Sequence, residues 1–186
     1  MAAQTSISLI VFDGDDTLWE GLDGGYISGV HYLDAGRDDY TFRPLDKLHI
    51  LRNDGQRFRM YPEVPGVLQE LQRLGVLVSL ASYNHTAPTL HAMQTFAIFQ
   101  YFLRPLAIWS SQKDRMLSQI IDELHNDGYD VRPKNTLFID DDRSGNYRRQ
   151  MAGIGVHFLQ KDVDITDLSQ LLEHPRFALT AAQSNR

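Results

Sequence analysis

Two pairs of aspartates carry the most distinctive chemistry in the sequence. Asp13 and Asp15 come directly after one apolar run, and Asp140 and Asp141 come directly after another. Residues two apart in an extended segment point to the same side, so the carboxylates of Asp13 and Asp15 are expected to lie close together. At about 4 Å and an effective dielectric of roughly 20, two such charges repel by about 4 kcal/mol. The cluster is therefore stable only if a cation binds or one carboxyl group holds a proton.

The types of ligand available favour magnesium. The candidate donors are all oxygens, which select a hard cation, and a shell left open for water and substrate favours Mg²⁺. An EF-hand calcium loop needs Gly at its sixth position and Glu at its twelfth, whereas this chain has Leu18 and Gly24 there. Taken alone, residues 13–17 are also compatible with a polar turn that only closes a strand.

A hydroxyl group and an ammonium group follow two further apolar runs. Ser82 comes after the run 76–81, and Lys113 comes shortly after the run 106–109. Taken singly, a serine after a strand is typical of a turn or a helix cap, and a lysine is typical of a solvated surface. Because both occur at successive strand ends, together with the two aspartate pairs, they indicate a shared site.

The apolar runs predict the buried strands of a parallel sheet. Each is short and apolar on both faces, as central strands of such sheets are. The runs cover residues 8–12, 76–81, 106–109 and 136–139, and a fifth covers 155–159. Helical periodicity lies between them, notably over 65–74 and 117–124. Alternating strands and helices predict an α/β fold, a Rossmann-like three-layer sandwich around a central parallel sheet, in which ligands bind beyond the carboxyl ends of the strands.

One segment interrupts this alternation. Residues 19–61 are rich in Gly, Asp and Tyr and contain the hairpin signal Asn53-Asp54-Gly55. The segment is long for a connection and short for an independent core. We therefore expect a small β-hairpin flap, or minimal cap, inserted in a single domain that spans residues 1–186. We expect residues 178–186 to form a disordered tail.

Composition narrows the class of protein. The chain has 186 residues, of which 42% are hydrophobic and 23% charged, as in an ordinary globular protein. The formal charge of −6 argues against broad binding to nucleic acid, and no apolar run approaches the roughly 20 residues of a membrane-spanning helix. The lack of cysteine excludes disulfides, zinc knuckles and thiol nucleophiles. We expect a cytoplasmic protein with neither nucleic acid nor membrane as a partner.

The order of the polar clusters resembles that of the haloacid dehalogenase-like (HAD) phosphatases. The first motif of that family, DxDxT, is similar to Asp13-Gly14-Asp15-Asp16-Thr17, and Ser82, Lys113 and Asp140-Asp141 are similar, in order, to the second, third and fourth motifs. The chain resembles the magnesium-dependent phosphatase branch of this family more closely, and this resemblance covers most of the chain. It rests on Thr17-Leu18-Trp19, Asp54-Gly55-Gln56, Tyr61-Pro62-Glu63-Val64-Pro65 and Leu74-Gly75-Val76.

The resemblance implies a Mg²⁺-dependent hydrolase of phosphoric monoesters, of the acid phosphatase or the protein-tyrosine-phosphatase type. Asp13 is then the nucleophile that forms an aspartyl-phosphate. Asp15 is the general acid toward the leaving oxygen and the base toward water, and repulsion from Asp13 raises the pKa of Asp15 in the required direction. Mg²⁺ is held by the Asp13 carboxylate, the Asp15 backbone carbonyl and a carboxylate of Asp140 or Asp141. The substrate is a phosphorylated small molecule or a phosphoprotein.

The second and third motifs imply phosphate binding. Ser82, with Tyr83 beside it, is expected to bind a phosphate oxygen, and Lys113 is expected to neutralise phosphate charge. Two residues depart from the family pattern. Gly14 stands where the family commonly has a bulky apolar residue, which predicts looser backbone beside the nucleophile. Tyr83 stands where related magnesium-dependent phosphatases often have Arg, so their substrate preference does not carry over.

Other interpretations stay open. Thr17-Leu18-Trp19 followed by Gly21 also resembles phosphatase-like domains that transfer an acyl or glyceryl unit to a carrier protein. A signalling receiver, phosphorylated on aspartate without turnover, has its paired acids at the first strand, whereas here the paired acids follow the fourth. A non-catalytic metal-binding or interaction module is the third alternative.

Overall fold

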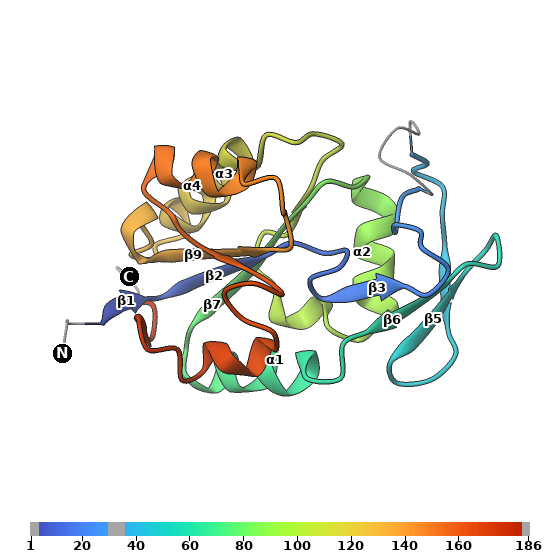
Figure 1. The fold of residues 1–186 in the computed structure, drawn as a ribbon, viewed down its shortest axis with the longest axis horizontal. Coiled ribbons are helices and arrows are strands. Elements are labelled where there is room, and N and C mark those ends of the chain that lie inside the picture. The colour runs from blue at the N-terminus through green and yellow to red at the C-terminus, as the bar shows by residue number, and fades with distance from the viewer. Residues whose placement is uncertain (1–3, 30–35, 184–186) are drawn as a thin grey trace.

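A five-stranded parallel sheet forms the centre of the computed structural model, which describes residues 4–29 and 36–183. Its strand order is β10-β9-β2-β7-β8, which confirms the predicted α/β Rossmann-like class (Figure 1). The strands are β2 (Leu9–Phe12), β7 (Leu77–Ser82), β8 (Leu106–Ala107), β9 (Thr136–Asp140) and β10 (His157–Gln160). β2, β7 and β9 agree with the predicted runs to within one residue at each end, whereas β8 stops after two residues and β10 starts two residues later than predicted, at His157.

Helices cover both faces of this sheet. α3 (Lys113–Asn126) and α4 (Asn146–Ile154) lie on one face, and α1 (Val64–Arg73) lies on the other, as Figure 1 shows. α2 (Thr86–Thr95) follows β7 in the chain. The described residues also include three short 3₁₀ helices: η1 (Phe99–Tyr101), η2 (Pro133–Asn135) and η3 (Leu168–Leu171). Within residues 4–29 and 36–183, no helix has the length and hydropathy needed to cross a lipid bilayer.

The position of α1 follows from local signals. Pro65 lies in its first turn, where a missing N–H leaves no intrahelical bond unmade. Gly75, just beyond its end, has a φ of +73°, a left-handed conformation that glycine adopts at little cost. The helix predicted over 65–74 is thus confirmed to within a residue, and the apolar stripe predicted over 117–124 lies within α3.

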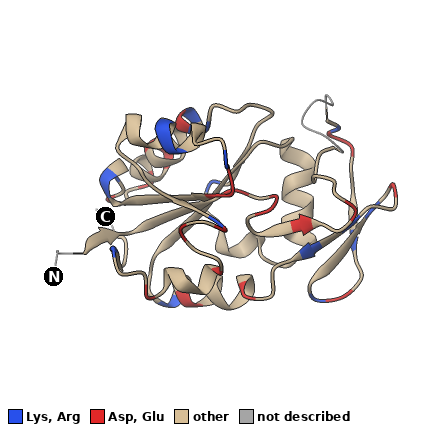
Figure 2. Cartoon of the chain, viewed as in Figure 1, with Lys and Arg blue, Asp and Glu red and all other residues tan. Residues whose placement is uncertain are grey.

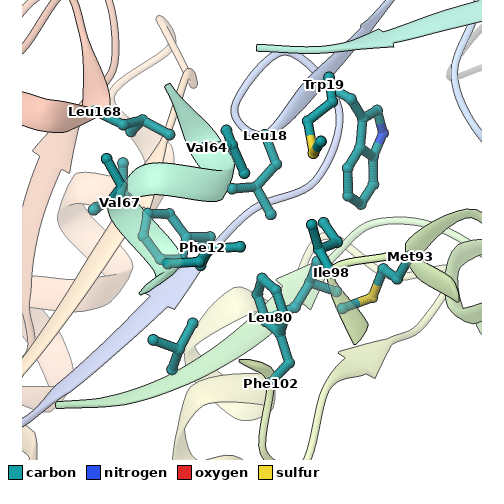
Figure 3. Close-up of a cluster of buried hydrophobic side chains, with 14 of the residues drawn as sticks. Phe12, Leu18, Trp19, Val64, Val67, Leu80, Met93, Ile98, Phe102 and Leu168 are labelled. Carbon is teal, nitrogen blue, oxygen red and sulfur yellow. The ribbon is translucent and has the colours of Figure 1, made fainter. Parts of the chain in front are cut away.

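Strand β2 divides two buried apolar clusters. Ile10 and Phe12 belong to the cluster on the α1 side, and Leu9 and Val11 belong to the cluster on the α3 side. This alternation is required of a strand that is covered on both faces. Figure 3 shows Phe12 packed close to Val67 of α1. Because both faces of β2 are held by packing, the position of the residue that follows it is fixed.

Residues 19–61 contribute a second, antiparallel sheet with the strand order β3-β6-β5-β4. Its strands are β3 (Trp19–Gly21), β4 (Phe42–Pro44), β5 (His49–Arg52) and β6 (Arg57–Met60). β5 and β6 form the hairpin predicted around Asn53-Asp54-Gly55. In Figure 1 the sheet lies at the end of the molecule opposite β1 (Thr5–Ile7). Residues 30–35 of this segment lie outside the described residues.

A buried arginine fixes the loop that follows β3. The Nη1 group of Arg52 donates to the backbone carbonyls of Tyr26, at 2.6 Å, and Ile27, at 3.2 Å. The Nη2 group of the same side chain pairs with the Asp54 carboxylate at 2.8 Å. These contacts hold the backbone around Ile27 against the antiparallel sheet, and that backbone reaches the candidate active site.

The C-terminal segment differs from the disordered tail predicted over 178–186. Strand β11 (Phe177–Leu179) pairs in parallel with β1 (Thr5–Ile7), and the N–H of Thr180 donates to the carbonyl of the last β1 residue at 2.9 Å. The prediction is wrong for the start of this segment, because a three-residue strand held by backbone pairing leaves no periodic pattern in the sequence. Residues 184–186 lie outside the described part of the chain.

Candidate active site

The polar residues singled out in the sequence meet at the carboxyl edge of the parallel sheet. β2 lies between β7 and β9, so the residues that follow these three strands are neighbours. Figure 2 shows the acidic segments after β2 and β9 close to each other near the middle of the molecule. A cleft of about 460 Å³ opens there. It is lined by every site residue predicted from the sequence: Asp13, Asp15, Ser82, Tyr83, Lys113, Asp140 and Asp141.

Lys113 brings a positive charge to this edge. It is the first residue of α3, and its side chain is 1% exposed. Its Nζ donates to the Ala81 carbonyl at 2.6 Å, forms an ion pair with Asp13 and lies 3.5 Å from Asp140 Oδ2. Burial alone would lower the pKa of Lys113, but the two carboxylates outweigh it and raise that pKa. The ammonium group therefore stays charged and is aimed at the acidic cluster.

Three carboxylates surround one point beside this ammonium. One oxygen from each of Asp13, Asp140 and Asp141 lies within 4.8 Å of the other two. Burial, reinforced by the charge of Asp13, raises the pKa of Asp140 to about 8 and that of Asp141 to about 7. The electrostatic cost of ionising all three groups together is thus high, as the sequence predicted for a cluster without a cation.

One oxygen of this cluster has no hydrogen-bond donor. Asp140 Oδ1 accepts from the Asp142 N–H at 2.8 Å, whereas the buried Oδ2 accepts no hydrogen bond from any residue that the structure describes. An unsatisfied buried carboxylate oxygen is costly, and a hard cation at the centre of the three carboxylates removes that cost. The donor set therefore fits Mg²⁺. The carboxylate of Asp142 is engaged elsewhere, because it accepts the N–H groups of Ser144 and Tyr147 at the start of α4.

Asp15 has a different environment from Asp13. Its carboxylate accepts from Trp19 Nε1 at 2.9 Å, from the Ile27 N–H at 3.2 Å and from Asn84 Nδ2 at 2.7 Å. Burial raises the pKa of Asp15 to about 7, with a smaller contribution from Asp13 and against the effect of these donors. The sequence predicted the direction of this shift but assigned it to Asp13, whereas burial is the larger cause.

Ser82 is the last residue of β7 and Tyr83 is the next residue, and both line the cleft. Ser82 is 1% exposed, and its Oγ accepts from Asn84 Nδ2 at 2.8 Å. Tyr83 is half-buried, and its ring centre lies 4.8 Å from that of Trp109. Ser82 is therefore fixed in a buried network, while Tyr83 belongs to an aromatic cluster at the rim of the cleft.

Position 14 needs a glycine because a side chain would not fit there, and not because of its backbone conformation. The φ of Gly14 is not in the left-handed region. The looser backbone predicted from the sequence therefore does not explain why glycine occurs here. A Cβ atom at Gly14 would lie 2.7 Å from a ring carbon of Trp19 and 3.1 Å from Ser82 Oγ. The missing side chain leaves room for the indole that donates to Asp15.

Sequence reasoning missed the residues that hold Asp15 in place. Trp19 and Asn84 both donate to its carboxylate, and the Ile27 N–H comes from a loop without any motif. The position of Trp19, four residues after Asp15 in a tight turn, was the one available signal. Asn84 gave none, because an asparagine after a strand is typical of an ordinary turn.

The chain matches a known family along most of its length. The sequence model of the Acid Phosphatase family matches residues 6–167. Magnesium-dependent phosphatase 1 of Homo sapiens is 27% identical over 166 residues, a match that covers 89% of this chain and 85% of the human protein.

Two solved structures resemble the fold. One, described as a predicted phosphoglycolate phosphatase from Haemophilus somnus, has a TM-score of 0.62 at 13% identity and covers 90% of this chain and 97% of its own. The other is the N-terminal part of a Bacteroides fragilis protein containing a phosphatase domain complexed with Mg. It has a TM-score of 0.60 at 16% identity and covers 96% of this chain and 42% of its own. At these identities the likeness concerns the fold.

The packing at Gly14 leads to a first prediction. We expect Gly14→Ala to lower the free energy of unfolding by about 1–3 kcal/mol, because the added methyl group forces the Trp19 indole out of its place. Urea denaturation followed by tryptophan fluorescence measures this loss. Gly153→Ala is the matched control, since a Cβ at that helical position meets nothing within 4 Å and is expected to stabilise slightly. Equal stability of Gly14→Ala and the wild type would contradict the packing argument.

The raised carboxyl pKa values predict how stability depends on pH. Without a bound cation, Asp15, Asp140 and Asp141 have folded-state pKa values of about 7, 8 and 7, against 3.8 for an unperturbed aspartate. The folded chain therefore binds more protons than the unfolded chain between about pH 4 and pH 8, and its stability falls as the pH rises through that window.

Mg²⁺ competes with those protons, so its stabilising effect is expected to grow with pH. Thermal unfolding with chelator and with Mg²⁺, at several values between about pH 5 and pH 8, measures the difference. We expect the gap between the two melting temperatures to widen toward the higher pH, and to shrink in Asp140→Asn. A gap that is the same at every pH would contradict the proposed competition.

Proposed function

We propose that this chain, which belongs to the acid phosphatase family, hydrolyses phosphomonoesters through a covalent aspartyl-phosphate on Asp13. It is a phosphatase of the HAD superfamily, its cofactor is Mg²⁺, and its substrate is a phosphorylated molecule. The observation that carries the proposal is the meeting of Asp13, Lys113 and the unsatisfied oxygen of Asp140 at one point of the cleft.

Asp13 is suited to the role of nucleophile. It continues β2, because its N–H donates to the Ile139 carbonyl at 2.9 Å, so its backbone is fixed by the sheet. A carboxylate needs no base to activate it. In the first step an Asp13 oxygen attacks phosphorus in line, an O–P bond forms, and the bond to the leaving oxygen breaks. In the second step water attacks the same phosphorus, and the Asp13–phosphorus bond breaks.

Asp15 is suited to move the proton in both steps. Its pKa of about 7 allows it to hold a proton at neutral pH and also to release it. It donates this proton to the leaving oxygen in the first step. In the second step its carboxylate accepts a proton from the attacking water, which restores the starting state.

The remaining residues bind the charged groups. We propose that Asp13, Asp140 and Asp141, with the backbone carbonyl of Asp15, hold Mg²⁺. When bound, the ion neutralises the acidic cluster and the phosphoryl oxygens. Ser82, Tyr83 and Lys113, which all line the cleft, are proposed to bind the phosphoryl group.

The cleft and the antiparallel sheet bear on the size of the substrate. We propose that residues 19–61 act as a minimal cap on a single domain. Tyr26 and Arg143 line the cleft together with the proposed catalytic side chains. Such a site admits either a phosphorylated small molecule or a phosphorylated side chain of a protein.

A test of the nucleophile follows from these assignments. We expect Asp13→Asn to lower the hydrolysis of para-nitrophenyl phosphate by more than about 1,000-fold, and chelation of Mg²⁺ to abolish it. Asp122→Asn, an exposed aspartate of α3, is the matched control and is expected to keep wild-type activity. Rapid quenching followed by mass spectrometry is expected to find one phosphoryl group on Asp13 in the wild type.

The alternatives give different results in the same experiment. A phosphorylated Asp13 that persists without turnover would indicate a receiver. No phosphorylation and no hydrolysis would indicate a transferase-type or non-catalytic domain. Full activity of Asp13→Asn would contradict the proposal.

A further inference from the structure

The amide side chain of Asn84 lines the cleft but has no role in the mechanism described so far. It lies in the turn between β7 and α2 and is 2% exposed. Its Nδ2 donates to Asp15 Oδ2 at 2.7 Å and to Ser82 Oγ at 2.8 Å. One side chain thus joins the proposed general acid to the proposed phosphate-binding hydroxyl group.

The orientation of this amide is fixed by its other end. Asn84 Oδ1 accepts the backbone N–H of Ser28 at 3.1 Å, and an N–H can only donate, so the oxygen must face Ser28 and the nitrogen must face the cleft. Ser28 is itself held, because its Oγ accepts the N–H of His85 at 2.9 Å. The amide cannot rotate without leaving a buried N–H unpaired.

The two oxygens of Asp15 have unequal surroundings. Oδ1 accepts from Trp19 Nε1 at 2.9 Å and is the nearer oxygen to the Ile27 N–H, at 3.2 Å against 3.4 Å for Oδ2. Oδ2 accepts chiefly from Asn84. A carboxylate oxygen has two lone pairs, so Oδ2 is the oxygen with room for a proton, and Asn84 determines where that oxygen points.

The contact with Ser82 has a similar consequence. Because Ser82 Oγ accepts from Asn84, its hydroxyl hydrogen is not needed for that contact. Ser82 lines the cleft, so this hydrogen is available to a phosphoryl oxygen. The same amide therefore directs a donor on Ser82 and a proton carrier on Asp15 toward one substrate.

We propose that Asn84 is a positioning residue that aims Asp15 Oδ2 at the leaving oxygen and leaves the Ser82 hydroxyl free for the phosphoryl group. The inference rests on the proposed function, in which Asp15 protonates the leaving oxygen. A substrate with a poor leaving group, such as an alkyl phosphate, needs that protonation, whereas para-nitrophenyl phosphate releases a stable anion without it. Loss of Asn84 is therefore expected to discriminate between leaving groups.

The test compares substrates in two variants. Asn84→Ala removes the whole amide, and Asn84→Asp keeps its shape and the acceptor for Ser28 but presents an oxygen to Asp15. Because the second step is the same for every substrate, the readout is the rate of the first step, measured as release of the leaving group in a single turnover. We expect this rate to fall by about 100-fold or more for alkyl phosphates in both variants, and by less than about 10-fold for para-nitrophenyl phosphate. Asp15→Asn is expected to give the same dependence on the leaving group.

Matched controls separate positioning from loss of structure. Asn135 also links backbone groups through its amide, to Arg132 and Asp130, but outside the cleft, so Asn135→Ala is expected to slow no substrate selectively. The extra charge of Asn84→Asp would weaken phosphate binding and raise KM for every substrate alike, which is distinct from a selective fall in the first-step rate.

The outcomes are distinguishable. An equal loss of the first-step rate for all leaving groups in the Asn84 variants, in an enzyme that still depends on Asp13, would overturn the role of Asn84 while leaving the proposed function intact. Full activity of Asp13→Asn would overturn the proposed function and this inference with it. Selective loss for alkyl phosphates, shared by Asn84→Asp and Asp15→Asn, would support the positioning role.

Discussion

The balance of charge around Asp13 is the constraint on which the rest of the structure depends. Three carboxylates converge there within 4.8 Å, and Lys113 supplies a buried ammonium group that pairs with Asp13 and lies 3.5 Å from Asp140. Lys113 does not satisfy all three carboxylates, because Asp140 Oδ2 accepts no hydrogen bond from the described residues. The site therefore has a deficit of positive charge, which a divalent cation fills.

The parallel sheet makes this arrangement possible. β7 and β9 both lie next to β2, so the carboxyl ends of the three strands bring Asp13, Ser82 and Asp140 to one edge. Lys113 reaches the same point from the start of α3, where the Ala81 carbonyl holds its Nζ at 2.6 Å. The antiparallel sheet contributes differently, because Arg52 fixes the loop whose Ile27 N–H contacts Asp15.

The parallel sheet and the charged residues at its edge could be predicted from the sequence, but the contacts that orient the side chains of the site could not. Asp13, Lys113 and Asp140 could be predicted because each follows a run of apolar residues, and parallel strands bring such positions together. The roles of Gly14 and Asn84 depend on side chains that meet only after folding, since Trp19 occupies the space at Gly14 and Ser28 sets the amide of Asn84. β11 was missed because backbone pairing, unlike side-chain burial, leaves no periodic signal.

The most direct test of this account is a crystal structure grown with Mn²⁺, which prefers the same oxygen ligands as Mg²⁺ and can be located by its anomalous scattering. The account predicts an anomalous peak within about 2.5 Å of carboxylate oxygens of Asp13 and of at least one of Asp140 and Asp141. A cleft without any such peak at saturating Mn²⁺, or a peak bound only by residues outside the cluster, would contradict it.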